Sequence, residues 1–416
     1  MAVIDLGELR DDQPAPGAPG RAPRAVGRPL RVLVVLLVAL VTLASAAPPT
    51  RLAGWTVPGG VGAAAFVVGD RVYVVRPLDW RPGALREVVA YRNGRERWRS
   101  RLPGPGDVVS VWEMGDRVLT AGPNGPDQSW QTAAYETATG RLSWRQSALG
   151  YPAGDALLLQ PTSDSGPQQV RRVAVADGRT LWTAPPDQEL RFVLGPSGVE
   201  RLLVVPEAGE TVVLDAATGD RIAARDLHPG EPPTQRQVLT AGDLVLEIRR
   251  DAVAAYQGET LRSRWTAELP SLDGVETCGD LLCAGRQTGG VWALDPATGA
   301  VRWATDRWFG VVRADGGRLL VDAGDSAGPH LAVLDGDDGR RVADLAGWTV
   351  VSPHEVDDRL FLTRPLGRGR LLLAELDLPG GRLPVRGVLS GVDCAAGRAL
   401  VVCRDRDGDF AVRRLP

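Results

Sequence analysis

Short apolar segments alternate with turn-forming residues along most of the chain. Residues 291–303, VWALDPATGAVRW, show the pattern most clearly. Bulky apolar residues open this segment, and a break from Asp295 to Gly299 follows, where aspartate, proline, threonine and glycine favour a tight connection. Val301 and Trp303 then alternate with polar residues, as they would on a return strand. The segment therefore predicts a β-hairpin.

This hairpin pattern recurs at a nearly constant distance. Its predicted turn glycines are 38 to 46 residues apart. They are Gly94, Gly140, Gly178, Gly219, Gly258, Gly299, Gly339 and Gly381. Five repeats carry a tryptophan at one place after the turn, namely Trp98, Trp144, Trp182, Trp265 and Trp303. A fixed period of this size predicts an array of repeated supersecondary units.

Each repeat has room for a second hairpin ahead of the first. A Gly-Asp pair precedes an apolar segment at Gly69-Asp70 and again at Gly115-Asp116. Four short strands in about 40 to 45 residues match the size of a propeller blade. We therefore expect an all-β fold, a β-propeller of four-stranded blades. An open solenoid is the alternative, and it would need polar capping units that the sequence does not show.

The number of blades stays open between seven and nine. Eight full repeats end near Leu389, and residues 392–416 supply three further strands without a tryptophan strand. Residues 52–57, which include Trp55, resemble that missing strand and could close the ring beside the C-terminal segment. We expect eight blades, because propellers usually have four to eight.

The ALDPATGAVRW pattern resembles the PQQ-like (pyrrolo-quinoline-quinone-type) propeller repeat. The resemblance covers residues 55–416 and implies that the repeated tryptophan docks between neighbouring blades. Gly140, Gly219 and Gly299 stand in the Thr-Gly element of the same repeat. Many members of this family bind no quinone and serve as extracytoplasmic assembly or interaction scaffolds, whereas others are quinone-dependent dehydrogenases.

The N-terminal part of the chain has a different composition. Residues 1–31 are polar and rich in Pro, Ala, Gly and Arg, which predicts a disordered tail. Residues 32–47 form an uncharged run with four arginines on its N-terminal side, so we expect a transmembrane signal-anchor helix with a cytoplasmic N-terminus. A linker, residues 48–54, would connect it to an extracytoplasmic propeller. Cleavage near Ala46 and secretion is the alternative.

The four cysteines form two local pairs, Cys278 with Cys283 and Cys394 with Cys403. Each pair straddles a predicted hairpin turn, where cross-strand Cβ atoms lie within reach of disulfide geometry. We expect two intra-hairpin disulfides outside the cytoplasm. Four buried thiols are the alternative, and no CxxC metal motif is present.

Composition removes several function classes. The formal net charge is −3, which argues against a nucleic-acid partner. All basic residues are arginines, so neither a P-loop lysine nor a Schiff-base lysine is available.

Several stretches resemble catalytic or metal-binding motifs, but each has a simpler explanation. Residues 324–328, GDSAG, match an esterase nucleophile elbow without the following helix or an upstream HGGG loop. Two acidic clusters could suggest calcium, but neither has EF-hand spacing, and hairpin tips explain both. They are Asp335, Asp337, Asp338 and Asp405, Asp407, Asp409. The three histidines are scattered as His228, His330 and His354, which favours surface loops over a metal site.

Several tryptophans lie outside the repeated position, among them Trp80, Trp112, Trp130 and Trp308. They could anchor a partner on one face or pack in the core. A quinone enzyme of this family would carry adjacent cysteines against its cofactor, and the sequence has none. We therefore expect no enzyme activity, catalytic residue, cofactor or metal. The expected function is an anchored scaffold that binds an envelope protein or small ligand. A quinoprotein dehydrogenase and an envelope sensor that signals through its tail are the alternatives.

Overall fold

The computed structural model describes most of the chain from residue 52 onward. The described residues are 52–79, 81, 83–104, 106–124, 129–162, 169–185, 189–195, 197–206, 210–227, 237–249, 252–287, 289–308, 310–323, 330–353 and 359–416. All regular structure in these ranges is β-strand. The predicted tail, anchor helix and most of the linker lie outside the described residues. No helix within these ranges is long and apolar enough to cross a membrane.

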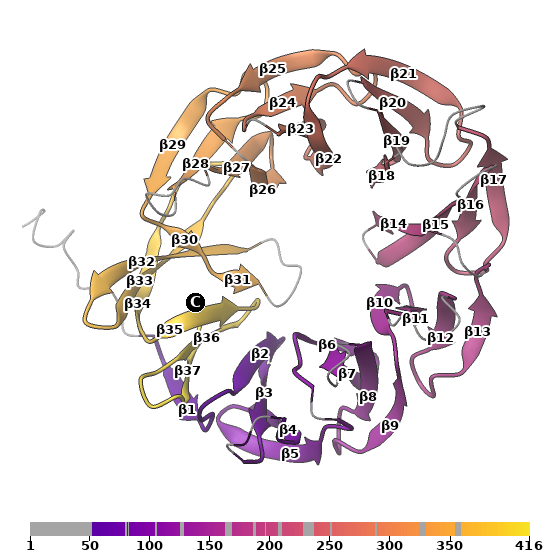
Figure 1. Cartoon of the computed structure of the whole chain (residues 1–416). Helices are drawn as coiled ribbons and strands as arrows, with labels where there is room; N and C mark the ends of the chain where they lie inside the picture. The colour runs from indigo at the N-terminus through magenta and orange to yellow at the C-terminus, as the bar shows by residue number, and fades with distance from the viewer. Residues whose placement is uncertain are drawn as a thin grey trace, which may run out of the picture. The chain divides into compact units, whose positions relative to one another are not determined.

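The strands form antiparallel sheets of four that follow one another along the chain (Figure 1). Blade 1 is β2 (Ala64–Val68), β3 (Arg71–Pro77), β4 (Arg86–Arg92) and β5 (Arg95–Arg101); blade 2 is β6 (Ser110–Met114), β7 (Arg117–Asn124), β8 (Ser129–Glu136) and β9 (Leu142–Gln146). Blade 3 is β10 (Leu149–Ala153), β11 (Ala156–Gln160), β12 (Arg171–Ala174) and β13 (Thr180–Thr183); blade 4 is β14 (Glu189–Gly195), β15 (Gly198–Val205), β16 (Thr211–Asp215) and β17 (Arg221–Arg225).

The next four sheets continue the series. Blade 5 is β18 (Gln237–Ala241), β19 (Leu244–Arg249), β20 (Ala252–Gln257) and β21 (Ser263–Glu268); blade 6 is β22 (Leu272–Cys278), β23 (Leu281–Arg286), β24 (Val291–Leu294) and β25 (Val301–Thr305). Blade 7 is β26 (Gly310–Asp315), β27 (Arg318–Asp322), β28 (His330–Asp335) and β29 (Arg341–Ala346); blade 8 is β30 (Thr349–Val350), β32 (Leu360–Gly367), β33 (Arg370–Leu376) and β34 (Val385–Ser390).

Blade 9 combines the two ends of the described chain. It contains β35 (Val392–Ala396), β36 (Leu400–Arg404), β37 (Phe410–Arg414) and, on its outer edge, β1 (Gly54–Val57). Strand β1 pairs with β37 in antiparallel register, with Trp55 opposite Val412. The expected closure by the N-terminal strand is therefore present. A short extra strand, β31 (Ser352–Pro353), pairs in parallel with β35 on the inner side.

The described strands form eight hydrogen-bonded sheets, one of which contains eight strands, so nine sets of four strands can be distinguished, within the expected range of seven to nine. Blades 3 and 4 are hydrogen-bonded into one sheet through a single pair, Ala153 with Gly198, but each keeps its own four strands. Blade 8 is irregular but keeps four strands, although its first strand has only two residues. The C-terminal three strands become a full blade because β1 supplies the fourth.

Buried apolar side chains form a separate cluster between each pair of neighbouring blades, including blades 9 and 1. The last cluster joins Val57 and Val412 of blade 9 to Val67, Val74 and Val89 of blade 1. Figure 1 shows the sheets following one another around a common centre. The core is therefore a closed series of apolar layers, each lying between two sheets. Side chains of a strand point alternately to the two faces of its sheet, so each blade packs one face against the blade before it and the other against the blade after it.

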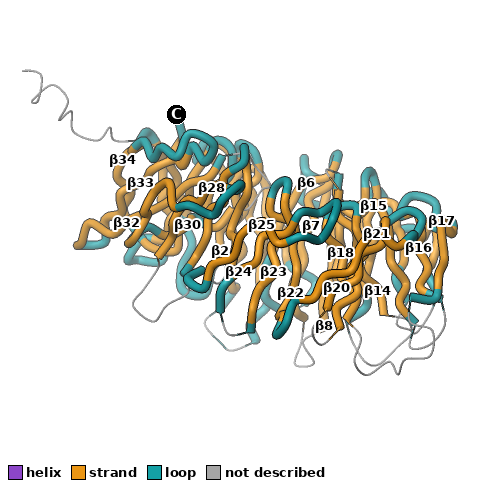
Figure 2. The backbone as a smooth tube through the Cα atoms, turned by 90° about the horizontal axis from the view of Figure 1, so that it is seen from above, coloured by secondary structure: helices purple, strands orange, loops and turns teal. Residues whose placement is uncertain are grey.

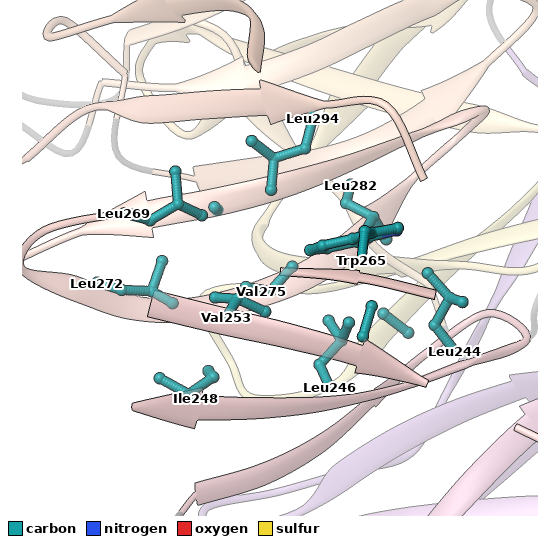
Figure 3. Packing of buried hydrophobic residues seen from close by; sticks show 13 residues of the cluster. Leu244, Leu246, Ile248, Val253, Trp265, Leu269, Leu272, Val275, Leu282 and Leu294 are labelled. Carbon is teal, nitrogen blue, oxygen red and sulfur yellow. The ribbon is translucent and has the colours of Figure 1, made fainter. Parts of the chain in front are cut away.

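The repeated tryptophan lies between blades and fixes how closely they approach. In blade 1, the Trp98 indole covers the turn of blade 2, and its Nε1 donates a hydrogen bond to the Thr137 carbonyl at 2.8 Å. A Cβ on Gly140 would lie 2.4 Å from the Trp98 ring, so only glycine fits there. Equivalent indole bonds are donated by Trp144 to Val175, by Trp265 to Pro296 and by Trp303 to Gly336. Figure 3 shows Trp265 among the leucines between blades 5 and 6.

Blades 3 and 4 are two of the blades in which this contact differs. Trp182 still covers Gly219, whose Cβ would come 2.9 Å from its ring. At the next junction the outer strand of blade 4 carries Ala223 in the tryptophan position, and Leu261 of blade 5 takes the place of the turn glycine. Leu261 is fully buried with a φ of 52°, and its N–H donates to the Gln257 carbonyl as Gly299 does to Asp295. The assignment of Gly258 as the turn glycine is therefore wrong.

The exchange of Trp and Gly for Ala and Leu can be tested by a double-mutant cycle. Ala223→Trp alone should destabilise, because its indole meets the Leu261 side chain, and Leu261→Gly alone should destabilise by removing a buried side chain. The double variant recreates the tryptophan-glycine contact. We expect a favourable coupling free energy of about 1–3 kcal/mol in denaturant unfolding. Additive effects, such as those expected for Ala223→Trp combined with Leu320→Ala in blade 7, would contradict this account.

Candidate functional site

Antiparallel order gives the blades two different faces. The turn from first to second strand and the turn from third to fourth strand share one face, the turn face. The connections from second to third strand and from one blade to the next share the opposite face, the loop face. Figure 2 views the strands as they run between these two faces. Ala53 and Arg414 are bonded through their backbones, so the chain enters blade 9 on the turn face.

One cleft on the turn face lies between blades 7 and 8. It has a volume of about 320 Å³. Its charged lining consists of Arg313, Asp315, Arg359, Glu375, Asp377 and Arg386. Leu378, Pro379 and Pro384 provide the apolar part of the wall. A cleft with three arginines and three carboxylates suits a polar or zwitterionic group.

Glu375 is the centre of the ionic network in this cleft. Arg359 donates to both of its carboxylate oxygens, Nε to Oε1 at 2.9 Å and Nη2 to Oε2 at 3.0 Å. Arg386 Nε donates to Oε2 at 2.8 Å. The hydrogen bonds from Arg359 hold the pKa of Glu375 below its ordinary value; burial opposes them, and the charges of both arginines add to the shift.

Arg359 also reaches across to the last blade. Its guanidinium donates to the backbone carbonyls of Arg398 at 3.0 Å and Pro416 at 3.1 Å. Its guanidinium lies over the Phe361 ring, with the guanidinium carbon 4.9 Å from the ring centroid. This side chain therefore ties the cleft wall to blade 9 and limits how far the cleft can open.

A second cleft lies between blades 2 and 3 on the same face, with a volume of about 550 Å³. Arg172 forms its floor and pairs with Asp155 at 2.9 Å while donating to the Ala217 carbonyl of blade 4. Asp116 and Leu181 line the rim, and the Leu181 side chain is largely exposed. Both clefts are lined by arginines that bridge blades.

The cysteines are joined as the sequence predicts. Cys278 is bonded to Cys283 with Cα atoms 5.8 Å apart, and Cys394 to Cys403 with Cα atoms 4.1 Å apart. Three of the four side chains are almost fully buried. Each bond closes one hairpin inside one blade, so the disulfides stiffen blades 6 and 9 and do not join blades.

The aromatic and histidine candidates lie mostly in packing positions. Trp308 is buried between blades 6 and 7, and Trp112 packs against the cluster between blades 2 and 3. Trp130 is partly buried in β8. The His330 ring meets Trp308 edge-on at 5.7 Å, and its Nε2 is 3.5 Å from Asp344. These contacts support the core-packing alternative for Trp308.

The acidic clusters stabilise turns. Asp405 Oδ1 accepts hydrogen bonds from the backbone N–H groups of Asp407 and Asp409, and Asp409 accepts one from Gly59 across the ring closure. Asp335 accepts from the Asp337 N–H and pairs with Arg318. Among the described residues, no group of three or more Asp, Glu, His or Cys side chains is arranged to hold a metal ion.

Other sequence candidates lie outside the described residues, namely the GDSAG segment 324–328, His228, His354 and Trp80. Sequence reasoning missed the bridging arginines. Their signal is an arginine directly after the Gly-Asp turn: Arg71 pairs with Glu113 of blade 2 at 2.6 Å, and Arg117 donates to the Ala176 carbonyl of blade 3.

A family model described as outer membrane protein assembly factor BamB matches residues 84–305 and, in a second overlapping match, residues 249–400. Together the two matches span about three quarters of the chain. The chain belongs to this family. Its members are PQQ-like repeat propellers, as the hairpin, turn and tryptophan pattern predicts. No curated protein sequence matches the chain.

Three solved structures are similar to the chain at low sequence identity. BamB from Moraxella catarrhalis is 16% identical, with coverage of 66% of this chain and 92% of that one and a TM-score of 0.38. The computationally designed Ika8 protein is 14% identical, with coverage of 74% and 96% and a TM-score of 0.48. A europium-containing methanol dehydrogenase is 14% identical, with coverage of 87% and 84% and a TM-score of 0.42. At these values the similarities carry no statement about function.

The network around Glu375 predicts a pH-dependent stability. Because the folded-state pKa is lowered, the pair stabilises the fold above the ordinary value of 4.5 and loses this effect as the pH falls below it. Glu375→Gln should lower the free energy of unfolding by about 1–3 kcal/mol at pH 7, and the difference from wild type should shrink toward pH 3. The exposed pair of Glu210 and Arg221 is the control, since Glu210→Gln should change stability by under about 1 kcal/mol. A pH-independent difference for Glu375→Gln would rule out the ionic explanation.

Proposed function

We propose that this protein is an extracytoplasmic binding scaffold, held in the plasma membrane by residues 32–47, that works by recognising an envelope protein. The observation that carries the proposal is the closed ring itself. Docked blades with buried layers on both sides form a rigid support, and they display longer connections on one face and tight turns on the other. Rigid scaffolds of this kind position recognition residues on their loops. Membership in the family described as outer membrane protein assembly factor BamB supports an envelope partner.

The disulfides support a location outside the cytoplasm. Two bonds that use all four cysteines of the chain favour an oxidising compartment, because cytosolic proteins keep their thiols reduced. The same pairing supports a role without catalysis. Every cysteine is used within a hairpin, so none is left to form the adjacent-cysteine ring that supports the cofactor in quinone enzymes of this type.

Location is tested by thiol labelling in intact cells. Val61 lies on the loop face in the connection between blades 9 and 1 and is 91% exposed. A Val61→Cys variant should react with a membrane-impermeant maleimide before cell lysis, because its thiol would face the outside. Val67→Cys, at a fully buried position, should react only after denaturation. Labelling of Val61→Cys that requires lysis would place the propeller in the cytoplasm and end the proposal.

Binding is tested by affinity purification of the detergent-solubilised full-length chain. We expect a stoichiometric envelope protein by mass spectrometry and no quinone absorbance. A variant without residues 32–47 should lose membrane association in cell fractionation and, once purified, should keep the partner. A quinone chromophore that disappears on calcium chelation would instead establish the quinoprotein alternative.

A further inference from the structure

The strands β32 and β33 of blade 8 are longer than the corresponding strands of blades 7 and 9, and their connection lies on the loop face. The innermost strand of this blade, β30, has two residues and pairs only with Leu362 and Thr363 of β32. The chain then leaves as β31 and pairs with blade 9. Strand β32 continues for four further residues, all of them exposed. The stretch 364–370, RPLGRGR, therefore stands uncovered on its inner side within the described chain.

The tip of this hairpin carries an arginine in a conformation that does not suit it. Gly367 pairs with Arg370, which leaves Arg368 and Gly369 as a two-residue loop with φ values of 55° and 69°. Two-residue loops with two positive φ values favour Asn-Gly. The chain uses that sequence in blade 1, where Asn93 and Gly94 have φ values of 54° and 76°. An arginine at the same place costs backbone free energy, which its side chain must offset in another way.

Four arginines gather at this tip. Arg364, Arg368 and Arg370 belong to the hairpin, and Arg406 comes from the neighbouring turn of blade 9. Arg406 Nη2 donates to the Arg368 carbonyl at 3.2 Å. The Arg364 guanidinium lies over the Trp348 ring at 4.9 Å.

These four arginines differ from the arginines of the clefts in that they have no carboxylate partner among the described residues. By contrast, Arg359, Arg386 and Arg172 each pair with a carboxylate. The nearest acidic turn, 405–409, uses Asp405 and Asp409 to hold backbone N–H groups. Leu366 and Val392 add apolar surface, with exposed fractions of 43% and 51%.

We propose that this surface, formed by Arg364, Arg368, Arg370 and Arg406 with Leu366 and Val392, docks an acidic segment of a partner protein. Guanidinium groups bind carboxylates through paired hydrogen bonds, and several guanidinium groups within one hairpin and its neighbouring turn would engage successive Asp or Glu side chains. The exposed leucine and valine would contact apolar side chains among them. The inference rests on the proposed binding function and gives the chemistry of the partner.

The hairpin tip and the entry of the described chain lie on opposite faces of the ring. The tip is a connection from second to third strand and lies on the loop face. The chain enters the ring on the turn face, where Arg414 Nη2 donates to Asn93 Oδ1 at 3.0 Å. The net charge of −3 disfavours a nucleic acid.

The test measures binding of a fluorescein-labelled decapeptide, Gly-(Asp-Glu)₄-Gly, to the detergent-solubilised full-length chain by fluorescence anisotropy. We expect a Kd on the order of 100 μM at 50 mM salt that weakens as salt rises. The matched peptide with Asn and Gln in place of Asp and Glu should not bind. Absence of binding by the acidic peptide would overturn the proposal.

Variants at the tip separate charge from folding. Arg368→Asn restores the Asn-Gly loop, so its thermal midpoint should equal or exceed that of wild type while peptide affinity falls about threefold. Arg368→Asn combined with Arg370→Gln and Arg406→Gln should weaken binding about thirtyfold. Arg95→Gln is the control, since Arg95 follows the Asn93-Gly94 loop of blade 1 as Arg370 follows Arg368-Gly369. Equal losses of peptide affinity in Arg95→Gln and Arg370→Gln would contradict the proposal, because they would show that any exposed arginine contributes to peptide binding.

Lipid is examined with the same proteins. Phosphatidylglycerol vesicles could bind wild type but not the triple variant, and could displace the peptide. That result would overturn the proposal, because it would identify a membrane surface as the ligand of the arginines. Retained peptide binding by the triple variant would also overturn the proposal. Failure of these experiments leaves the labelling and purification results unaffected, so the surface and the general function are judged separately.

Discussion

The contact on which the ring depends is the indole that covers a turn without a side chain. Because Gly140 and Gly299 have no Cβ, the Trp98 and Trp265 rings can lie directly against the next blade and still donate to a backbone carbonyl. This contact sets the spacing between two sheets at their outer edge, while apolar residues on the strands set it closer to the centre. Truncation of such a tryptophan to alanine typically removes about 3–5 kcal/mol, which is a large part of the stability of a domain. At the junction with Ala223 and Leu261, the large side chain comes from the turn and the small one from the outer strand.

Much of this architecture could be predicted from the chain because the repeat is local. The hairpin at 291–303, the closing strand with Trp55 and the pairing of Cys278 with Cys283 each depend on residues close in sequence or on one recurring pattern. The blade number could not be predicted in the same way. Blade 8 begins with a strand of two residues and has no Gly-Asp turn, so its pattern looks incomplete. The turn glycine of blade 5 was misassigned for a related reason, since the role of Leu261 depends on Ala223 in the blade before it.

The candidate sites were less predictable, because they are made of contacts between blades. Rare residues drew attention in the sequence, yet His330 and the acidic clusters turn out to be committed to packing and to turns. Arginine, the only basic side chain that carries a permanent charge here, forms the bridges instead. The distance in sequence between Arg359 and its acceptor in Pro416 is 57 residues, and nothing in the local pattern indicates that these two groups meet. The register of one sheet against the next decides such contacts, and it becomes visible only in three dimensions.

The shared last blade has a consequence for how the protein matures. Trp55 and Val412 are neighbours in one sheet, although more than 350 residues separate them. During synthesis the first strand therefore has no partner until β37 has been made, and the entropy of closing so long a loop opposes their meeting. Until then β1 has no hydrogen-bonding partner, and the apolar face of blade 1 that packs against blade 9 is exposed to solvent. A truncated chain would keep that surface open permanently, so the completed ring also distinguishes whole molecules from fragments, which chaperones and proteases could recognise by their exposed edge.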